Sequence, residues 1–415
     1  MIAFHYPPFA GSSGVQRTLR FSQYLPNDGW LPVVLSAHPR AYEKTSNDLI
    51  SEIPKEVETI RAFALDSARH LSIKGRHTQL LAIPDRWISW IIGAIPAGIR
   101  AIKHHKPELI WSTYPLATTH LIAYCLHKIT GVPWIADFRD PMIEQDPKTG
   151  EWAPRNKLVR KARLFIEESV VKHAIRVIFC TEGAKEICMK RYPKENHTQW
   201  HVIPNGFDEE TFQEAEKNLP EKVQEKKIRL LHSGLIYNTS DRDPSHFFEA
   251  VSQLKHERKI SSESLVITLR ACGHENDYKK MVADKDIADI IEFKPPIPYS
   301  EAIKEMLLTD GLLIFQGYTS NPAIPAKLYE YLRAKRPILA LADHHGDTAK
   351  LLSKLGMKHI AALDDHDEIK KHIEDFITSI NNGAIVTLEQ CVINNYSRRN
   401  TAHLLSEVCN EASRT

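Results

Sequence analysis

Apolar residues in the first half of the chain form short continuous runs instead of alternating with polar residues. Several of these runs are followed by a segment whose apolar residues recur with helical spacing. Strands buried on both faces have such uninterrupted runs, because helices cover both sides of a parallel sheet. The pattern predicts a parallel sheet between layers of helices. The predicted strands are residues 2–6, 30–36, 108–113, 133–138 and 176–181.

A second alternating series follows a charged segment, residues 209–227, that contains no strand-like run. Its predicted strands are residues 228–234, 264–270, 290–294, 311–315 and 337–342. The last helical pattern, residues 396–408, precedes no further strand, so it must pack on an element already formed. We therefore predict an α/β protein with two doubly wound, Rossmann-like domains facing each other across a cleft. The predicted parts are an N-terminal domain (1–205), a linker (206–227), a C-terminal domain (228–390) and a segment, 391–415, whose helix returns to the N-terminal domain.

Length and charge narrow the class of protein. The chain has 415 residues, enough for two or three domains at about 150 residues each. Its 54 Lys and Arg nearly balance its 52 Asp and Glu, so we expect no nucleic-acid partner. The six cysteines are scattered without CxxC pairs, which is typical of a reducing compartment. The N-terminal sequence lacks the pattern of a signal peptide, and we expect a cytoplasmic protein.

One apolar segment is a candidate for membrane contact. Residues 85–106 combine Trp87 and Trp90 with a basic run at 103–106, as interfacial helices do. The apolar part is shorter than the roughly 20 residues that span a bilayer. We expect this segment to lie near the end of the N-terminal domain that binds an acceptor substrate, and to make peripheral contact with the inner face of the membrane. A core helix is the alternative, because its polar face is small.

The loop after the first predicted strand, residues 7–17, is rich in glycine and serine. Its glycines allow close approach to a ligand, and the helix that follows offers free N–H groups to an anion. The spacing is GxxG, so the loop is neither the dinucleotide fingerprint nor a P-loop. A tight turn without ligand is the alternative. The candidate phosphate or acceptor contacts are Gly11, Ser12, Ser13, Gly14 and Arg17.

Charged residues cluster at the end of another predicted strand, in the sequence ADFRDP. Asp137, Arg139 and Asp140 stand together there. Ligands of open parallel sheets bind beyond the carboxyl ends of the strands, which makes Arg139 and Asp140 candidate catalytic residues. A structural Asp–Arg pair is the alternative.

A helix predicted within residues 321–341 places two charged residues on one face. Lys327 lies in the first turn and Glu330 follows three residues later. A lysine near a helix N-terminus opposes the helix dipole unless an anion is bound there. The pattern therefore favours a phosphate at Lys327 and sugar hydroxyls at Glu330. A solvated Lys–Glu pair is the alternative.

The loop after the first strand of the second series contains Gly234 and Arg242. Arg242 is a candidate clamp for a diphosphate. Two DxD patterns, at residues 241–243 and 365–367, precede helical segments and are better explained as helix caps than as cation ligands. No HExxH or Cys/His array occurs, and we expect no metal site.

These segments together resemble a known family. YPPFAGSSGVQR, PWIADFRDP, HVIPNGFD, LLHSGLIY and IPAKLYEYLRAKRPILAL occur in the order and spacing of GT-B glycosyltransferases similar to family 4. Members of that group transfer sugars from nucleotide-diphosphate donors with retention of anomeric configuration. The resemblance spans nearly the whole chain.

The resemblance implies roles for particular residues. Lys327 matches a diphosphate-contacting position, and Glu330 matches the carboxylate that binds ribose or sugar. The sequence departs from the family at Pro322, where a second Glu is common, and at Leu235, where an Arg is usual, so Arg242 is the candidate substitute. The catalytic set is Lys327, Arg242, Asp140 and Arg139, and the donor-binding set is Glu330, Lys327, Gly234, Asn205, Gly206 and Leu328.

The resemblance also implies the substrates. The reaction needs no cofactor or metal, because positive groups stabilise the leaving diphosphate. The donor is a nucleotide-diphosphate sugar, with a UDP-sugar favoured. The acceptor is a glycan, a lipid-linked molecule or a small molecule, in cell-surface polysaccharide or glycoconjugate biosynthesis. A nucleotide-sugar epimerase of the same architecture and a catalytically weakened nucleotide-sugar-binding protein are the alternatives.

Overall fold

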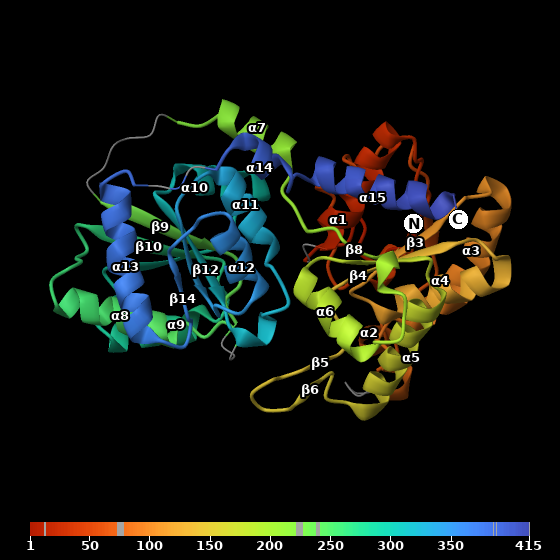
Figure 1. The fold of residues 1–415 in the computed structure, drawn as a ribbon, viewed down its shortest axis with the longest axis horizontal. Helices are drawn as coiled ribbons and strands as arrows, with labels where there is room; N and C mark the ends of the chain where they lie inside the picture. The colour runs from red at the N-terminus through yellow and green to blue at the C-terminus, as the bar shows by residue number, and fades with distance from the viewer. Residues whose placement is uncertain are drawn as a thin grey trace. The chain divides into compact units, whose positions relative to one another are not determined.

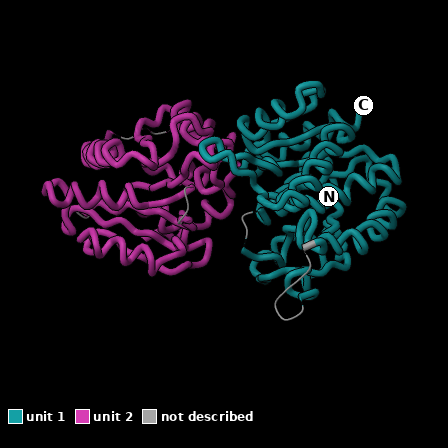
Figure 2. The backbone as a smooth tube through the Cα atoms, turned by 90° about the horizontal axis from the view of Figure 1, so that it is seen from below, with its two compact units in different colours: residues 1–205, 398–415 teal, residues 206–397 magenta. Residues whose placement is uncertain are grey.

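The computed structural model describes residues 1–11, 14–72, 79–220, 227–237, 241–384, 386 and 388–414. The chain forms two compact units, shown in different colours in Figure 2. Unit 1 comprises Met1–Asn205 and Arg398–Thr415, and unit 2 comprises Gly206–Ser397. Each unit has its own parallel sheet with helices on both faces (Figure 1). The predicted α/β class with two Rossmann-like domains is confirmed, and the cleft between them stays a prediction.

The sheet of unit 1 is built around the first residues of the chain. Ile2 forms parallel bridges to Leu35 on one side and to Ser112 on the other. The neighbouring strands are parallel throughout. Their order across the sheet is β2 (Thr59–Ala62), β1 (Val34–Ala37), residues 1–3, β3 (Ile110–Thr113), β4 (Trp134–Arg139), β7 (Arg176–Phe179) and β8 (Trp200–Val202). The edge strand β2 is only half buried, so it lacks the apolar run from which strands were predicted.

Helices cover both faces of this sheet. The C-terminal helix α15 (Arg398–Ser413) packs on α1 (Gly14–Tyr24), as predicted for a helix that returns to the N-terminal domain. Its buried residues, among them Ala402 and Leu405, share a hydrophobic core with Phe21. The remaining elements are α2 (Ser67–His70), α3 (Ile91–His105), α4 (Ala117–Thr130), α5 (Lys157–His173), α6 (Glu182–Arg191) and the short strands β5 (Glu144–Gln145) and β6 (Trp152–Ala153).

The sheet of unit 2 has six parallel strands in the order β11 (Ile291–Lys294), β10 (Leu265–Arg270), β9 (Ile228–Ser233), β12 (Gly311–Gln316), β13 (Ile338–Ala342) and β14 (Ile360–Ala361). This is the 3-2-1-4-5-6 order of a doubly wound fold. One hydrophobic core holds α8 (Ser245–His256), α9 (Glu275–Asp284) and α13 (His366–Asn381) against the sheet. A second core holds α7 (Glu209–Lys217), α10 (Tyr299–Leu308), α11 (Ala326–Ala334), α12 (Asp347–Lys354) and α14 (Gln390–Asn394).

The segment predicted as a linker is different in the structure. Residues 209–217 form helix α7, whose Phe212 is fully buried in unit 2. Its acidic residues looked solvated in the sequence, but Glu209 and Glu216 each accept hydrogen bonds from Arg333 of α11, the shortest at 2.7 Å. The predicted C-terminal segment also divides differently, since α14 belongs to unit 2 and the return to unit 1 begins at Arg398.

The segment predicted to contact a membrane belongs largely to the core. Trp90 is completely buried, and the indole N–H of Trp87 donates to the carbonyl of Ala41 at 3.0 Å. Among the large apolar residues of this segment, Ile92 is the exposed one, at 71%. The aromatic pair that suggested an interfacial helix is therefore a packing element. In the described ranges, no helix combines the length and the apolar character that crossing a bilayer requires.

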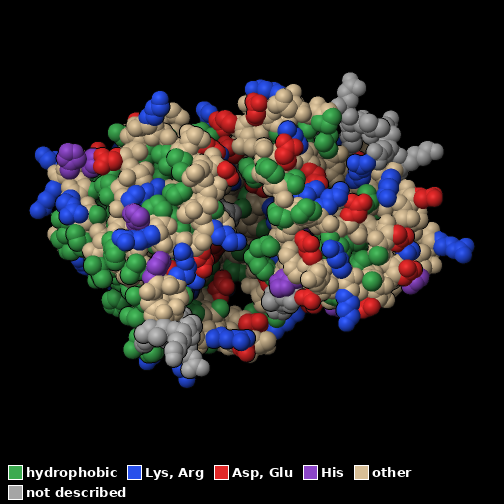
Figure 3. Space-filling view, turned by 180° about the vertical axis from the view of Figure 1, so that it is seen from behind, with side chains coloured by type: hydrophobic (Ala, Val, Ile, Leu, Met, Phe, Trp, Pro, Cys, Tyr) green, Lys and Arg blue, Asp and Glu red, His purple; other side chains and the backbone are tan. Residues whose placement is uncertain are grey.

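On the face shown in Figure 3, basic and acidic side chains are interspersed, as the small net charge leads one to expect.

Candidate functional site

Each sheet has a point at which the strand order reverses, and ligands of doubly wound folds bind beyond the carboxyl ends of the strands there. In unit 2 this point lies between β9 and β12, and in unit 1 between residues 1–3 and β3. The candidate residues of the two units lie at these ends. We describe them unit by unit.

Lys327 is the second residue of α11 and is held by a histidine. Pro325 precedes the helix with extended backbone (φ −63°, ψ 134°), so the helix starts directly at the site. The ammonium nitrogen of Lys327 lies 3.2 Å from Nε2 of His232, which is 1% exposed. Nδ1 of His232 lies 2.9 Å from the carbonyl of Leu313, which can only accept, so Nδ1 carries the proton. Nε2 therefore accepts from Lys327.

Gly234 leaves the space that the lysine occupies. Its φ of +109° lies in a region that favours glycine, and a Cβ there would come within 2.8 Å of the Lys327 ammonium nitrogen. Burial, followed by repulsion from Arg242, lowers the pKa of Lys327 to about 7. Among the described residues, no carboxylate lies within ion-pair distance of this ammonium group. A partly buried cation that no carboxylate contacts directly is suited to binding an anion.

Glu330 lies one turn further along the same helix. It is 9% exposed, and Oε1 accepts a hydrogen bond from the Tyr299 hydroxyl at 2.7 Å. The structure thus does not show a solvated Lys–Glu pair. Leu328, predicted to bind donor, is fully buried in the core behind α11, and its backbone N–H donates to Pro325. The side chain of Leu328 faces the core because a helix turns its second and third residues to different faces, and a role of Leu328 in donor binding stays a prediction.

Arg242 lies near Lys327 but is already partly engaged. Its guanidinium donates to the carbonyl of Leu235 at 3.1 Å, lies 3.3 Å from Asp241 and stacks 4.9 Å from the centre of the Tyr237 ring. The atom nearest to Asp241 is Nε of Arg242, which is buried and makes this ion pair without a well-aligned hydrogen bond. These contacts hold the Arg242 side chain in place and leave N–H groups that can donate to a phosphate oxygen.

Both DxD patterns take part in helix capping. Asp243 accepts from the backbone N–H of Ser245 at the start of α8, and Asp365 accepts from those of Asp367 and Glu368 at the start of α13. The described part of the chain contains no group of three or more His, Cys, Asp or Glu side chains arranged to hold a metal ion.

In unit 1 the glycine loop leads into α1. Gly11 is exposed and has a φ of +95°, which requires glycine, and Gly14 is the first residue of the helix. Ser12 and Ser13 lie outside the described residues.

Arg17, which was predicted to contact a ligand, is engaged by other residues of unit 1. It is 6% exposed, and its guanidinium donates to both oxygens of Asp137, at 2.8 and 3.2 Å. Further hydrogen bonds go to the carbonyls of Ile203 and Pro204. With four of its five N–H groups engaged, Arg17 joins α1 to β4 and to the end of unit 1. The structural Asp–Arg pair weighed from the sequence therefore exists, between Asp137 and Arg17.

Arg139 is the cation that remains at the end of β4. Its φ is +60°, and the strand register shifts between Asp137 and Arg139. The side chain is 9% exposed, makes one long hydrogen bond of 3.4 Å to the carbonyl of Tyr114, and has a buried Nε without partner. Burial raises the pKa of the adjacent Asp140, and burial together with Arg139 lowers the pKa of His5 to about 3. Strained backbone and an unpaired buried cation are features of functional sites.

Asn205 and Gly206 stand where the chain passes from unit 1 to unit 2. The amide oxygen of Asn205 accepts from the Cys180 thiol at 3.7 Å.

Sequence reasoning did not single out His5, His232 or Tyr299. His232 had a weak signal, since it lies two residues before Gly234 in the motif LLHSG.

Comparison with known proteins identifies the architecture. Residues 13–206 match the family model of the glycosyl transferase 4-like domain. A glycosyltransferase from Rickettsia africae ESF-5 superposes on 99% of this chain and 98% of its own, with a TM-score of 0.64 and 16% identity. The chain has the GT-B fold, and its residues 13–206 are similar to the glycosyl transferase 4-like domain.

Two further structures share the GT-B fold of this chain over nearly its whole length. Anabaena HepE in complex with UDP-glucose covers 99% of both chains, with a TM-score of 0.63 and 12% identity. Sucrose-phosphate synthase from Thermosynechococcus elongatus covers 99% of this chain and 98% of its own, with a TM-score of 0.65 and 12% identity. A search of curated proteins finds no match.

Proposed function

We propose that this protein is a glycosyltransferase that transfers a sugar, a hexose or a related unit, from a nucleotide-diphosphate donor to a hydroxyl group, with retention of configuration. The observation that carries the proposal is the Lys327 ammonium group, partly buried at a helix N-terminus beside Gly234, with no carboxylate of the described residues within ion-pair distance. A donor diphosphate would supply a negative charge there. A UDP-sugar is the favoured donor, since the similar HepE structure contains UDP-glucose.

In this proposal, some residues of unit 2 stabilise the leaving diphosphate and others bind hydroxyl groups of the donor. Negative charge grows on the diphosphate as the sugar bond breaks, and Lys327 and Arg242 are held in place before that happens. Glu330, fixed by Tyr299, would accept hydrogen bonds from ribose or sugar hydroxyls. This division of roles needs no bound metal and no cofactor.

Unit 1 would bind the acceptor, which we propose is a glycan or a lipid-linked molecule in cell-surface polysaccharide or glycoconjugate biosynthesis. Gly11 and Gly14 would give close approach at the loop, and Arg139 with Asp140 would face polar groups of the acceptor. The proposal places the protein in the cytoplasm and includes no membrane contact by Trp87 and Trp90, because both pack in the core.

The deciding experiment measures nucleotide diphosphate released from a panel of nucleotide sugars, with and without candidate acceptors, in the presence of EDTA. We expect acceptor-dependent release of UDP that EDTA does not reduce, because the site relies on cationic side chains. Interconversion of donor sugars without acceptor would indicate the epimerase. Donor binding without turnover would indicate a weakened enzyme, the alternative suggested by Pro322. Loss of activity in EDTA, restored by Mg²⁺, would contradict the metal-free mechanism.

Donor binding should take up a proton above neutral pH. The amine of Lys327 has a pKa of about 7 when no anion is bound, so it is largely neutral at pH 8 and charged at pH 6. A bound diphosphate favours the ammonium form and raises this pKa. We expect calorimetry in buffers of different ionisation enthalpy to show close to one proton taken up per donor at pH 8 and little at pH 6. Donor affinity should fall as the pH rises above 7. Lys327→Met is the control, and uptake that persists in it would assign the proton to another group.

A further inference from the structure

Large apolar side chains are exposed on and around the first half of helix α5, which Figure 1 shows at one end of unit 1 together with β5 and β6. They come from α5, from β6 before it and from the 3₁₀ helix η3 (Gln79–Ala82). Helix η3 is close to α5, because Nε of Arg163 lies 3.5 Å from the carbonyl of Pro84. The side chains of this α5 surface are 37–65% exposed: Leu80, Leu81, Trp152, Leu158, Leu164 and Phe165. A group of exposed apolar side chains marks an interaction site, whereas a single one does not.

The side chains on α5 form two rows. Leu158 and Phe165 are seven residues apart, so they lie on one face of the helix, two turns from each other. Trp152 lies beside the helix, because the Arg160 guanidinium is 5.5 Å from the centre of its ring. Arg160 and Leu164 are four residues apart and are therefore neighbours on the helix surface. Apolar side chains thus border the exposed face of α5 on both sides.

The charges of this surface are positive. Residues 152–165 contain five basic residues, at positions 155, 157, 160, 161 and 163, and no Asp or Glu. Lys157 and Lys161 are both exposed, and their spacing places them between the two apolar rows. Lys157 is also the first residue of α5, where its charge opposes the helix dipole unless an anion is near. A partner that matches this surface is therefore both apolar and negatively charged.

The α5 surface adjoins the candidate site of unit 1. Helix α5 runs back to the start of β7, so its first half lies toward the carboxyl ends of the strands, where Arg139 is. The guanidinium of Arg163 donates to the Tyr114 hydroxyl at 3.3 Å, and the Tyr114 carbonyl accepts from Arg139 at 3.4 Å. A partner bound to the α5 surface would therefore lie near the candidate acceptor residues.

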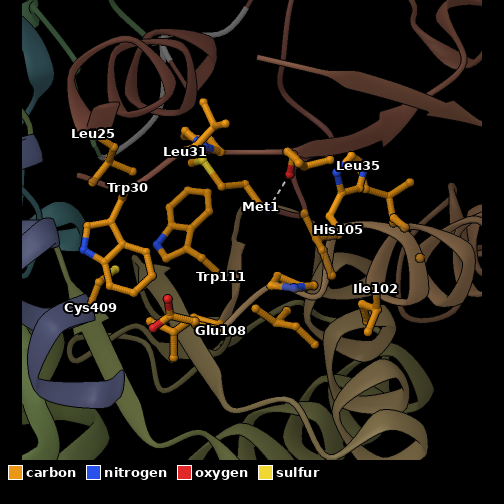
Figure 4. Close-up of a pocket in the computed structure, with 18 of the residues that line it drawn as sticks. Met1, Leu25, Trp30, Leu31, Leu35, Ile102, His105, Glu108, Trp111 and Cys409 are labelled. Carbon is orange, nitrogen blue, oxygen red and sulfur yellow. Dashed lines mark hydrogen bonds between the residues drawn. The ribbon is translucent and has the colours of Figure 1, made fainter. Parts of the chain in front are cut away.

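A second apolar feature of unit 1 lies at the opposite edge of the sheet. It is a cavity of 360 Å³ whose lining residues 105–109 precede β3, so it lies at the amino ends of the strands. Figure 4 shows Trp30 and Trp111 on one side of this cavity and Ile102 and His105 on the other. The cavity would hold a single apolar molecule, whereas the α5 surface presents its side chains outward. Its lining therefore provides a control for the test below.

We propose that the α5 surface binds the interfacial region of an anionic lipid bilayer. Leu158 and Phe165 would insert between the lipids, and Lys157 and Lys161 would lie at the lipid phosphates, since interfacial helices combine apolar and basic side chains in this way. The long lysine stems let the ammonium groups reach the phosphates beside inserted apolar neighbours. This membrane contact does not depend on the proposed function. Only its consequence rests on that function: the candidate acceptor site would face the headgroups, which favours a lipid-linked acceptor.

The test is flotation of the 415-residue protein with phosphatidylcholine vesicles that contain about 30% phosphatidylglycerol. We expect the protein to float with these vesicles and to stay largely unbound with phosphatidylcholine alone, because anionic lipids attract the lysines. Leu158→Ser combined with Phe165→Ser should weaken binding at least about tenfold. Lys157→Glu combined with Lys161→Glu should do the same. Flotation needs no nucleotide sugar, so its outcome is independent of the nucleotide-release experiment.

Matched variants outside the surface should bind like the parent. These are Ile129→Ser, at an exposed residue near the end of α4, Lys350→Glu in unit 2, and Ile102→Trp, which narrows the cavity. Circular dichroism would confirm that each variant is folded. A protein that does not float with anionic vesicles, or double variants that bind like the parent, would overturn the proposal. Loss of binding in Ile102→Trp would overturn it by placing the lipid in the cavity. A parent dimer that the double variants dissociate in light scattering would overturn it in favour of a second copy of the chain.

Discussion

Lys327→Ala should lower kcat about a hundredfold while donor affinity falls less. In the proposed mechanism the ammonium group contacts a leaving group whose charge grows in the transition state, so its removal would cost more there than in the ground state. Losing one such pre-positioned donor typically costs ~3 kcal/mol. Glu330→Gln should mainly raise the KM for the donor, because the hydrogen bonds that we propose it makes to hydroxyls would be present in both states. Steady-state kinetics would measure both effects, with the donor that the nucleotide-release experiment selects.

The same variants separate a catalytic from a structural role. Lys327 has a folded-state pKa of about 7 against 10.5 for an ordinary lysine, so below pH 7 the folded protein carries a desolvated charge that opposes folding. Lys327→Ala should therefore leave the Tm unchanged or raise it, most clearly below pH 7. Lys350→Ala, at an exposed lysine of α12, is the control with no expected effect. A sharp fall in Tm combined with wild-type turnover of the folded fraction would show that Lys327 is structural and that the donor binds elsewhere.

Arg17→Met should destabilise the protein by about 3–5 kcal/mol, because it leaves the fully buried carboxylate of Asp137 without its partner. For a unit of this size, such a loss lowers the Tm by roughly 10 °C. Thermal denaturation monitored by circular dichroism would measure it. Arg155→Met is the matched control, since Arg155 is 85% exposed in its pair with Glu151 and should contribute less than about 1 kcal/mol.

A second variant tests whether the loss comes from the unpaired charge. Arg17→Met combined with Asp137→Leu removes both charges and should recover part of the stability lost in the single variant. If Arg17→Met instead keeps the Tm of the parent and weakens substrate binding, then Arg17 contacts a ligand. That result would restore the role predicted from the sequence of the glycine loop.

The sequence by itself determined the strands and their order in two series, because strands buried on both faces need uninterrupted apolar runs. The runs at residues 228–234 and 311–315 correspond closely to β9 and β12. It also determined which ends of the strands carry charged residues, since Lys327 and Glu330 share a helix and Arg139 follows a strand directly. Such relations are local in the chain, so spacing alone reveals them. Strands β2 and β8 escaped prediction because edge or short strands lack a long apolar run.

Only the tertiary structure decided what each charged or aromatic side chain contacts. His232 contacts Lys327, 95 residues later in the chain, and Arg17 contacts Asp137, 120 residues later. At such sequence separations, the spacing of residues does not predict a contact. The sequence suggested that the acidic residues of α7 are solvated, but in the structure they bind Arg333. It also suggested that Trp90 lies at a membrane surface, but Trp90 is buried in the core. The physical reason is common to these cases: the free energy of a polar or aromatic group depends on its neighbours and its access to water, and folding brings those neighbours from distant parts of the chain.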